Sequence, residues 1–301
     1  MQTLHCAQKV IYEFNRNDEP ILQVSSGETI QIETYDCFEN QIQSPDTELS
    51  GIDWDRINPA TGPIYVKGAL PGDILKVTIE KLAIGEQGVL CTGPNLGVLG
   101  DQLTEMDFKI VPIRDQKAIF DDLELPLNPM IGVIGVAPEG DGISCGTPGS
   151  HGGNMDNTMV REGATLYFPV FAEGALFALG DFHAAMGDGE VGVSGIEIPG
   201  KATVTLEVLK GRAIAHPLLE DAHSWTTIVS APTLDEAAKE SVRTMALLLQ
   251  EKTGRSLSDL AMLLSAVGSV EICQIVDPLM TARCVLSKEI LTQMDVASLV
   301  E

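Results

Sequence analysis

The densest group of side chains able to do chemistry lies between Asp181 and Glu190, directly after an apolar stretch. One residue separates Asp181 from His183, so on an extended strand both point to the same face and can converge on one ion. Asp188 and Glu190 follow in a glycine-rich segment. Imidazole nitrogen with carboxylate oxygen suits Zn²⁺ best, whereas an all-oxygen site favours Ca²⁺ or Mg²⁺. The spacing therefore predicts a divalent metal site.

Two other segments supply candidate site residues. His151, Asn154 and Asp156 lie in a loop flanked by glycines, where the backbone can turn sharply or approach a ligand closely. Asp36 ends an apolar β stretch. An isolated Asp-x-His pair is more often a hydrogen-bonded loop pair than a metal site, and His151 also suits a structural role in a turn. Each motif alone is therefore weak evidence for a metal site, and only their combination favours one.

Residues 118 to 200 form a chemically unusual segment. They contain twelve acidic side chains against one basic side chain, Arg161, and 16 of the 29 glycines lie between 131 and 200. Carboxylates without matching cations either stay solvated or gather a cation, because neighbouring carboxylates repel one another. Solvated acids are the commoner outcome in proteins generally, but the ligand-rich motifs in this segment favour a cation site.

Bulk composition excludes several classes of function. The chain has 19 basic against 43 acidic side chains and a formal net charge of −24, which disfavours binding to nucleic acid or to an anionic membrane surface. The apolar run Met130 to Ala137 is too short to span a bilayer. The N-terminal residues lack a secretory-signal pattern, so we expect a cytoplasmic location. Six cysteines without a CxxC pair are expected to stay reduced.

Most of the chain up to residue 210 alternates short apolar stretches with glycine and proline, which predicts a mainly β fold, α+β overall. We expect a β-sandwich or jelly-roll-like core over residues 1–210, with glycine-rich active-site loops. The predicted strands are Glu28–Tyr35, Ile64–Gly68, Ile74–Leu82, Phe108–Ile113, Ala118–Phe120, Thr165–Phe171, Gly174–Asp181 and Ala202–Leu209.

The C-terminal part, residues 211–301, has a different sequence pattern, with helix signals in place of short strands. We expect it to pack on the first part as an α+β portion with two helices. Thr233 and Glu236 form a capping-box pattern ahead of an amphipathic helix over Leu234–Lys252. Ser256 begins a second helix that ends near Gly268, and a strand follows over Ser269–Val276. The two portions are compatible with one continuous domain.

At these motifs the sequence resembles the acetamidase/formamidase family along nearly its whole length. Four ordered motifs carry the resemblance: Asn58-Pro59-Ala60-Thr61-Gly62-Pro63 with Gly68-Ala69-x-Pro71-Gly72-Asp73, Ile131-Gly132-Val133-Ile134-Gly135-Val136-Ala137-Pro138, His151-Gly152-Gly153-Asn154-x-Asp156, and Gly180-Asp181-x-His183-Ala184-Ala185-x-Gly187-Asp188-Gly189-Glu190. The resemblance implies a β-sandwich with an α+β part, a homodimer or larger homo-oligomer, and hydrolysis of formamide, acetamide or similar amides.

Amide hydrolysis requires an activated water, stabilisation of an oxyanion and a proton for the leaving amine. We expect a divalent metal to activate the water, most simply Zn²⁺ with Ca²⁺ or Mn²⁺ as alternatives. The candidate ligands are His183 and Asp181, with Asp36 and His151 as further ligands.

Glu190 is the predicted general base and then general acid, because a carboxylate beside the activated water can take its proton and pass it to ammonia. Asp188 is the second choice for this role, and His151 is a further catalytic candidate. Asn154 and Asp156 are expected to bind the amide substrate.

Two alternatives remain open on the sequence alone. Cys145 is a potential nucleophile near His151 in an amidase without metal, although no lysine lies between Lys117 and Lys201 to complete a cysteine-type triad. A non-catalytic β-sandwich that binds a small ligand with a cation also explains acidic, glycine-rich loops.

Overall fold

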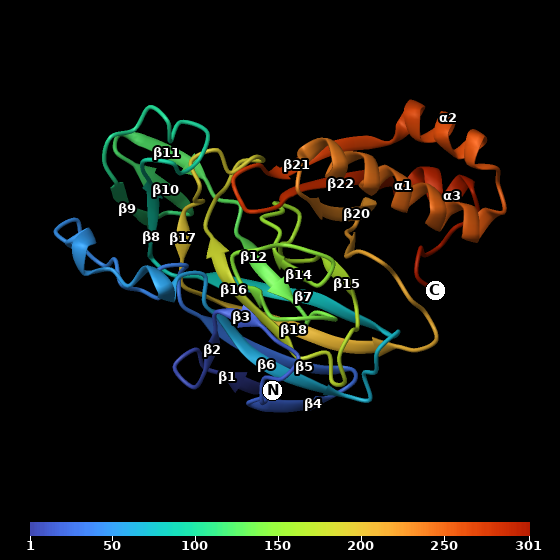
Figure 1. Ribbon diagram of the computed structural model, residues 1–301, viewed down its shortest axis with the longest axis horizontal. Helices are drawn as coiled ribbons and strands as arrows, with labels where there is room; N and C mark the ends of the chain where they lie inside the picture. Colours follow the sequence, from blue (N-terminus) through green and yellow to red (C-terminus); the bar gives the residue numbers. More distant parts are fainter.

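Two large β-sheets are packed face to face in the computed structural model, which describes residues 1–301 (Figure 1). The first sheet has nine strands in the order β1 (Gln2–Leu4), β5 (Glu28–Thr34), β18 (Gly200–Leu209), β7 (Ile74–Ile84), β15 (Thr165–Pro169), β19 (Leu218–Glu220), β20 (Ser224–Ala231), β22 (Met280–Ser287) and β21 (Ser269–Gln274). It runs without a break across residue 210, so both portions of the chain share it.

The second sheet has eleven strands. Its main path is β11 (Leu123–Pro126), β10 (Lys117–Phe120), β9 (Asp107–Arg114), β8 (Gln87–Thr92), β17 (Glu197–Ile198), β16 (Phe177–His183), β12 (Met130–Gly135) and β14 (Gly152–Asn154). The strand β6 (Ala60–Lys67) pairs with β16, and it also pairs with β2 (Val10–Ile11) and β4 (Leu22–Ser25). A separate ribbon joins β3 (Glu13–Phe14) to β13 (Ile143–Ser144), and the 3-10 turns Leu49–Gly51 and Trp54–Arg56 lie between β5 and β6.

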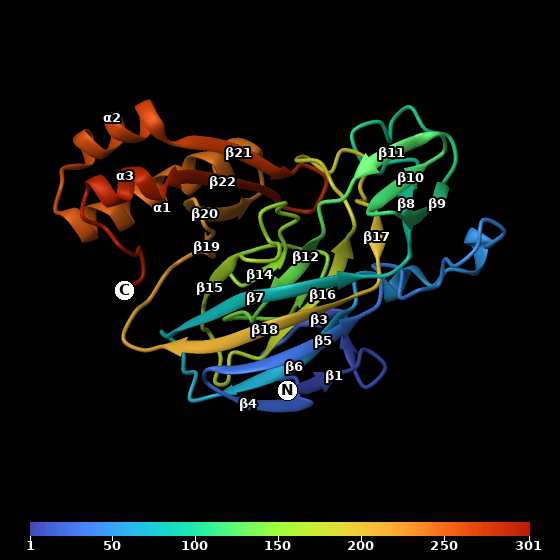
Figure 2. The ribbon, with the colours of Figure 1, turned by 180° about the vertical axis from the view of Figure 1, so that it is seen from behind.

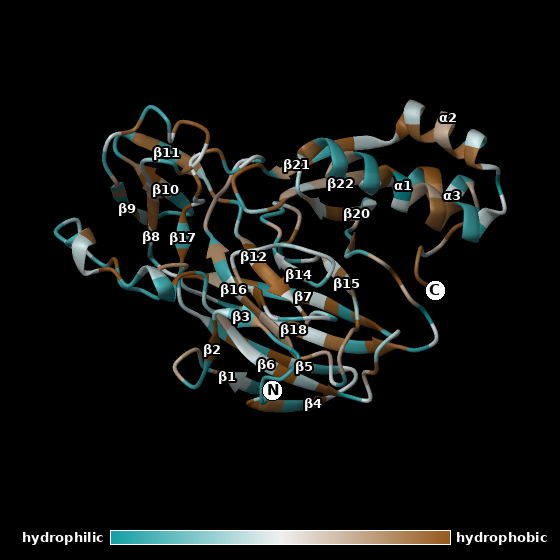
Figure 3. Ribbon diagram, in the orientation of Figure 1, coloured by the Kyte–Doolittle hydropathy of each residue, from teal (hydrophilic) through white to brown (hydrophobic).

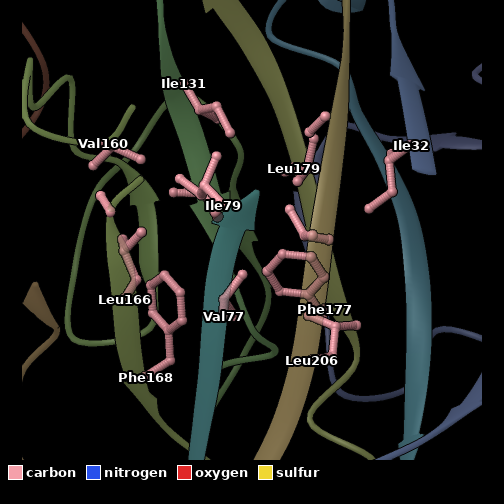
Figure 4. Packing of buried hydrophobic residues seen from close by; sticks show 14 of the residues in the cluster. Ile32, Val77, Ile79, Ile131, Val160, Leu166, Phe168, Phe177, Leu179 and Leu206 are labelled. Carbon is pink, nitrogen blue, oxygen red and sulfur yellow. The ribbon is translucent and has the colours of Figure 1, made fainter. Parts of the chain in front are cut away.

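The main core lies between the two sheets. Alternate residues of β5 and β18 are buried, as expected for strands with one covered face, whereas every residue of β12 and β16 is buried. Phe177 and Leu179 of β16 lie near Val77 and Ile79 of β7 and Leu206 of β18 (Figure 4). Asp181 has φ of 58°, which breaks the alternation of β16, so Phe182 also points into this core and the face that carries Asp181 and His183 is left for polar groups.

A second core lies under the C-terminal helices. The helix α1 (Leu234–Thr253) begins at Thr233, whose side chain accepts a hydrogen bond from the Glu236 N–H, and α2 (Leu257–Val267) begins in the same way at Ser256. Hydrophobic and hydrophilic stretches alternate along these helices (Figure 3). The apolar side chains of α1 pack against β20 and β22, and α2 packs on α1, beside the sandwich (Figure 2).

The predicted mainly β, α+β architecture is confirmed, and the sheets do not close into a barrel. The two predicted helices lie where their caps placed them, but a third short helix, α3 (Lys288–Gln293), was not predicted. The predicted strand Gly174–Asp181 was placed too early. Ala175 and Leu176 have φ of 58° and 54°, which belong to a turn, so β16 begins at Phe177 and continues to His183.

All six cysteines are free, as the sequence predicted. None of the helices combines the length and the apolar character that crossing a membrane requires.

Candidate active site

His183 lies at the centre of a group of buried carboxylates on the outer face of β16. Its Nε2 atom is 3.1 Å from Glu197 Oε1 and 3.7 Å from Asp181 Oδ1, and 4.0 Å from oxygens of both Asp156 and Glu190. All five side chains are buried. The predicted convergence of Asp181 and His183 from one strand face is therefore present, and it extends to three more carboxylates.

The register of the second sheet brings Glu197 to this place. His183 pairs directly with Glu197 of β17, while the neighbouring pair, Phe182 and Ile198, points into the sandwich core. A single register therefore satisfies both faces of the strand pair, since a slip by one residue would bury a carboxylate in the apolar core.

Three of these carboxylates stand on unusual backbone. Asp156, Asp181 and Glu190 have φ of 42°, 58° and 47°, in the left-handed region that side chains other than glycine rarely adopt. Such conformations persist only where the surrounding structure holds them, and they concentrate at functional sites. Three such conformations in one cluster indicate a functional site rather than a group of solvated acids.

Two glycines make room for the cluster. A Cβ atom on Gly132 of β12 would lie 2.4 Å from Asp156 Oδ1 and 2.5 Å from Asp181 Oδ2. A Cβ atom on Gly195 would lie 2.6 Å from His183 Nδ1. The absence of side chains at these positions lets two carboxylates and one imidazole approach one another closely.

Burial and mutual repulsion set the ionisation of the cluster in the metal-free chain. Burial raises the pKa of Asp156 to about 6 with a further contribution from Asp181, and it raises the pKa of Glu190 and of Glu197 well above the usual range. Burial alone lowers the pKa of His183, but the Glu197 and Asp181 carboxylates outweigh it and raise that pKa well above its usual value. In the folded chain these groups therefore bind protons more tightly than exposed groups of the same kind.

Several atoms of the cluster have no hydrogen-bond partner in spite of their burial. They are both carboxylate oxygens of Asp156, Oδ1 of Asp181, Oε2 of Glu197 and both ring nitrogens of His183. Two sets of ligand atoms each lie within 4.8 Å of one another, Asp156 with His183 and Glu190, and Cys37 with Asp181 and Glu197. Unsatisfied buried acceptors of this kind, together with an imidazole, suit a divalent cation such as Zn²⁺.

A cavity of about 380 Å³ opens onto the cluster. Asp181, Glu190 and Glu197 line its floor, and Phe38 and Trp54 pack edge to face in its wall. The connection between β21 and β22 contributes Asp277, which the C-terminal portion brings across to the sandwich (Figure 1).

Asn154 and Asp277 meet at this cavity. Asn154 Nδ2 donates to Asp277 Oδ2 at 3.0 Å, while Asn154 Oδ1 has no partner. Burial, followed by repulsion from Asp156, raises the pKa of Asp277 well above the usual range. The structure therefore places Asn154 at the cavity as a candidate substrate-binding group, whereas Asp156 lies deeper, in the His183 cluster.

The remaining predicted site residues lie outside the group around His183. Asp36 Oδ1 accepts hydrogen bonds from the backbone N–H groups of Phe38 and Asn40, and burial raises its pKa to about 6. His151 packs edge to face on Phe14 at 5.3 Å between ring centroids. Burial lowers the pKa of His151 to about 4, and no carboxylate lies within 4.0 Å of its ring nitrogens. The structure does not bring His151 to the other candidate ligands.

Asp188, the second choice for general base, is held in an ion pair. Its two carboxylate oxygens accept from Nη1 and Nη2 of Arg283 at 3.2 and 2.7 Å. Cys145, the alternative nucleophile, is fully buried with its Sγ donating to the Ile11 carbonyl at 3.5 Å, and burial raises the pKa of its thiol.

Sequence reasoning missed Glu197, Cys37 and Asp277. Glu197 stands before Ile198-Pro199-Gly200 and Asp277 before Pro278, so both look like turn residues. The one available signal was the surplus of acids over bases between residues 118 and 200, which includes Glu197.

Comparison with known proteins agrees with the geometry. The model of the acetamidase/formamidase family matches residues 5–145 and 141–230. The chain belongs to this family. A solved structure from Thermoanaerobacter tengcongensis, described as a predicted acetamidase/formamidase, is 50% identical with a TM-score of 0.96 and covers 99% of both chains. An acetamidase structure from Bacillus halodurans is 43% identical, with a TM-score of 0.95 over 98% of this chain and 100% of that chain.

A curated relative from Schizosaccharomyces pombe, named as a formamidase, is more distant. It is 24% identical over 62% of this chain, and the matched part spans 61% of its length. The match to this curated relative therefore spans less than two thirds of its length.

The raised carboxylate pKa values predict how the metal-depleted protein responds to pH. Asp36 and Asp156 bind their protons more tightly when folded, with a pKa of about 6 against about 4 when unfolded. Their contribution to the free energy of unfolding is therefore full below about pH 4 and is lost as the pH rises through about 6. Thermal unfolding after chelator treatment is expected to show a Tm that falls between about pH 4 and pH 7, where these carboxyls are protonated in the folded chain and ionised in the unfolded chain.

Two variants separate this local effect from the general repulsion of an acidic chain. Asp156→Asn is expected to reduce the fall in Tm, whereas Asp46→Asn, at an exposed carboxylate, leaves it unchanged. A Tm that is constant or rises over this range would show that the cluster does not hold its protons as described.

Proposed function

We propose that the chain is an amidohydrolase that converts small carboxamides, such as formamide or acetamide, to the carboxylate and ammonia with the help of a divalent metal. The observation that carries the proposal is the cluster around His183, where buried carboxylates with unpartnered oxygens lie beside a cavity lined by Asp181, Glu190 and Glu197. Membership in a family with acetamidase and formamidase names supports the same reaction.

The residues proposed to hold the metal are His183, Asp181 and Glu197, with Asp156 beside them. Zn²⁺ is the ion this mixture of imidazole and carboxylate favours, with Mn²⁺ or Ca²⁺ as alternatives. When bound, a divalent metal acts as a Lewis acid and lowers the pKa of water from about 16 to roughly 7. Glu197 and Asp156 are proposed in place of the predicted ligands Asp36 and His151, because those two join neither set of ligand atoms that lie within 4.8 Å of one another.

Glu190 is proposed to transfer the proton. It lines the cavity and approaches His183 within 4.0 Å, so it lies at the boundary between the cluster and the substrate space. Its carboxylate removes a proton from the attacking water and returns it to the nitrogen of the departing ammonia.

Asn154 is proposed to orient the substrate. Its Nδ2 donates to Asp277, which fixes the side chain in the cavity lining, while its buried Oδ1 has no hydrogen-bond partner. The free oxygen can accept an N–H of the carboxamide, the group that distinguishes an amide from an ester. Asp277 thus supports substrate binding from the C-terminal portion.

Replacement of Glu190 tests the proton-transfer role. Glu190→Gln keeps the size of the side chain but cannot accept the proton, so kcat for ammonia release is expected to fall by about 100-fold or more. Elemental analysis is expected to show an unchanged metal content. Full activity in this variant would remove Glu190 from the mechanism.

Replacement of Cys145 tests the alternative nucleophile. Cys145→Ala is expected to keep kcat within about threefold of the parent. The Cys145 thiol is buried and hydrogen-bonded to the Ile11 carbonyl, and Cys145 does not line the cavity. An inactive variant with normal metal content and a normal Tm would favour the cysteine mechanism over the metal-assisted one.

A further inference from the structure

Arg283 of β22 is a buried arginine next to the candidate site. Only 4% of its surface is exposed. It is the only Lys or Arg that pairs with a carboxylate in the glycine-rich segment after β16. A buried guanidinium is costly unless most of its five N–H groups find acceptors.

The acceptors of Arg283 come from three separate segments. Nε donates to Glu271 Oε2 on β21 at 2.7 Å, and Nη1 and Nη2 donate to the two oxygens of Asp188. Nη1 also donates to Asn157 Oδ1 at 2.8 Å and lies 3.3 Å from Thr158 Oγ1, which itself donates to Asp188 at 2.8 Å. One side chain therefore fastens two loops to the C-terminal sheet edge.

Each fastened residue stands next to a candidate site residue. Asn157 follows Asp156, and Asp188 lies two residues before Glu190. Asp156 and Glu190 both occupy left-handed backbone that local preference does not maintain. The loops that carry them therefore need an outside restraint, and the contacts of Arg283 supply one.

Backbone hydrogen bonds extend the same connection. The Gly189 N–H donates to the Cys273 carbonyl at 2.8 Å, and the Ile275 N–H donates to the Gly189 carbonyl at 3.2 Å. The segment that carries Glu190 is thus joined to β21 by an isolated parallel β-bridge between Gly189 and Gln274. Arg283 anchors it on one side of Gly189, and Glu190 projects into the cluster on the other.

We propose that Arg283 is a positioning residue, which acts through Asp188 and Asn157 to hold Glu190 and Asp156 at their places around His183. The proposal rests on the proposed function for its effect on turnover. It also assigns Asp188 the role of anchor, because the Arg283 guanidinium donates to both of its carboxylate oxygens.

Steady-state kinetics of ammonia release from acetamide, with metal-loaded protein, test the proposal. Arg283→Met is expected to lower kcat by about 100-fold with KM changed less than about threefold, because misplacement of the proton-transferring group affects turnover more than binding. Arg283→Lys retains a charge but not the planar fork, so an intermediate loss is expected. The matched control Arg243→Met, at an exposed arginine of α1, is expected to match the parent.

A double-variant comparison shows whether the effect passes through Asp188. If it does, Arg283→Met combined with Asp188→Asn loses about as much kcat as Arg283→Met alone. Additive losses, or an unchanged kcat in Arg283→Met, would overturn the proposal. Asp188→Asn and Arg283→Lys each provide the comparison if Arg283→Met does not fold.

Hydrogen exchange supplies a measurement that does not need activity. The Gly189 and Ile275 amides are expected to exchange about tenfold faster in Arg283→Met than in Arg243→Met, because the anchored loop opens more often. Unchanged exchange would contradict the positioning role even in an active enzyme. If the parent protein releases no ammonia, the proposed function fails, and the exchange rates still decide whether Arg283 restrains the loop.

Discussion

Four carboxylates surround one imidazole in a space that water scarcely reaches, and their mutual repulsion is the constraint on which the rest of the site depends. Carboxylates that are this close and this buried either take up protons or share a cation. Neighbouring lysine and arginine residues do not supply that cation to Asp156, Asp181, Glu190 or Glu197. In the proposed function a bound divalent metal neutralises this repulsion, which links the fold to the proposed chemistry.

Two kinds of element hold the carboxylates close together: paired strands on one side of the cluster, and loops restrained by distant contacts on the other. β16 and β17 present His183, Asp181 and Glu197 from strands whose opposite faces are locked in the sandwich core. Asp156 and Glu190 come from loops, and there the chain uses left-handed backbone and a clamp from Arg283. The C-terminal portion is therefore part of the site, since it supplies both this clamp and Asp277.

The sequence predicted those features that depend on neighbouring residues. The β texture, the helix caps at Thr233 and Ser256, and the convergence of Asp181 with His183 all follow from local patterns, and the structure contains them. Glu197 depends on strand register, and Asp277 contacts Asn154 across 123 positions of the chain. Such pairings follow from tertiary packing, which a single sequence does not reveal.

The same limit explains the roles assigned to His151 and Asp188. A histidine between glycines has the composition of a ligand loop, but packing turns the His151 ring towards Phe14. Asp188 lies in a string of potential ligands, but its partner Arg283 is 95 positions away. In both cases residue type and spacing were informative about the neighbourhood of the site, while side-chain direction was decided by distant parts of the chain.

The most direct test of the account is elemental analysis of the purified protein together with ammonia release from formamide and acetamide, before and after chelator treatment. The account predicts about one or more equivalents of divalent metal per chain, with ammonia release that is lost on chelation and restored by Zn²⁺. Ammonia release that persists at full rate in protein shown to be free of metal would contradict it.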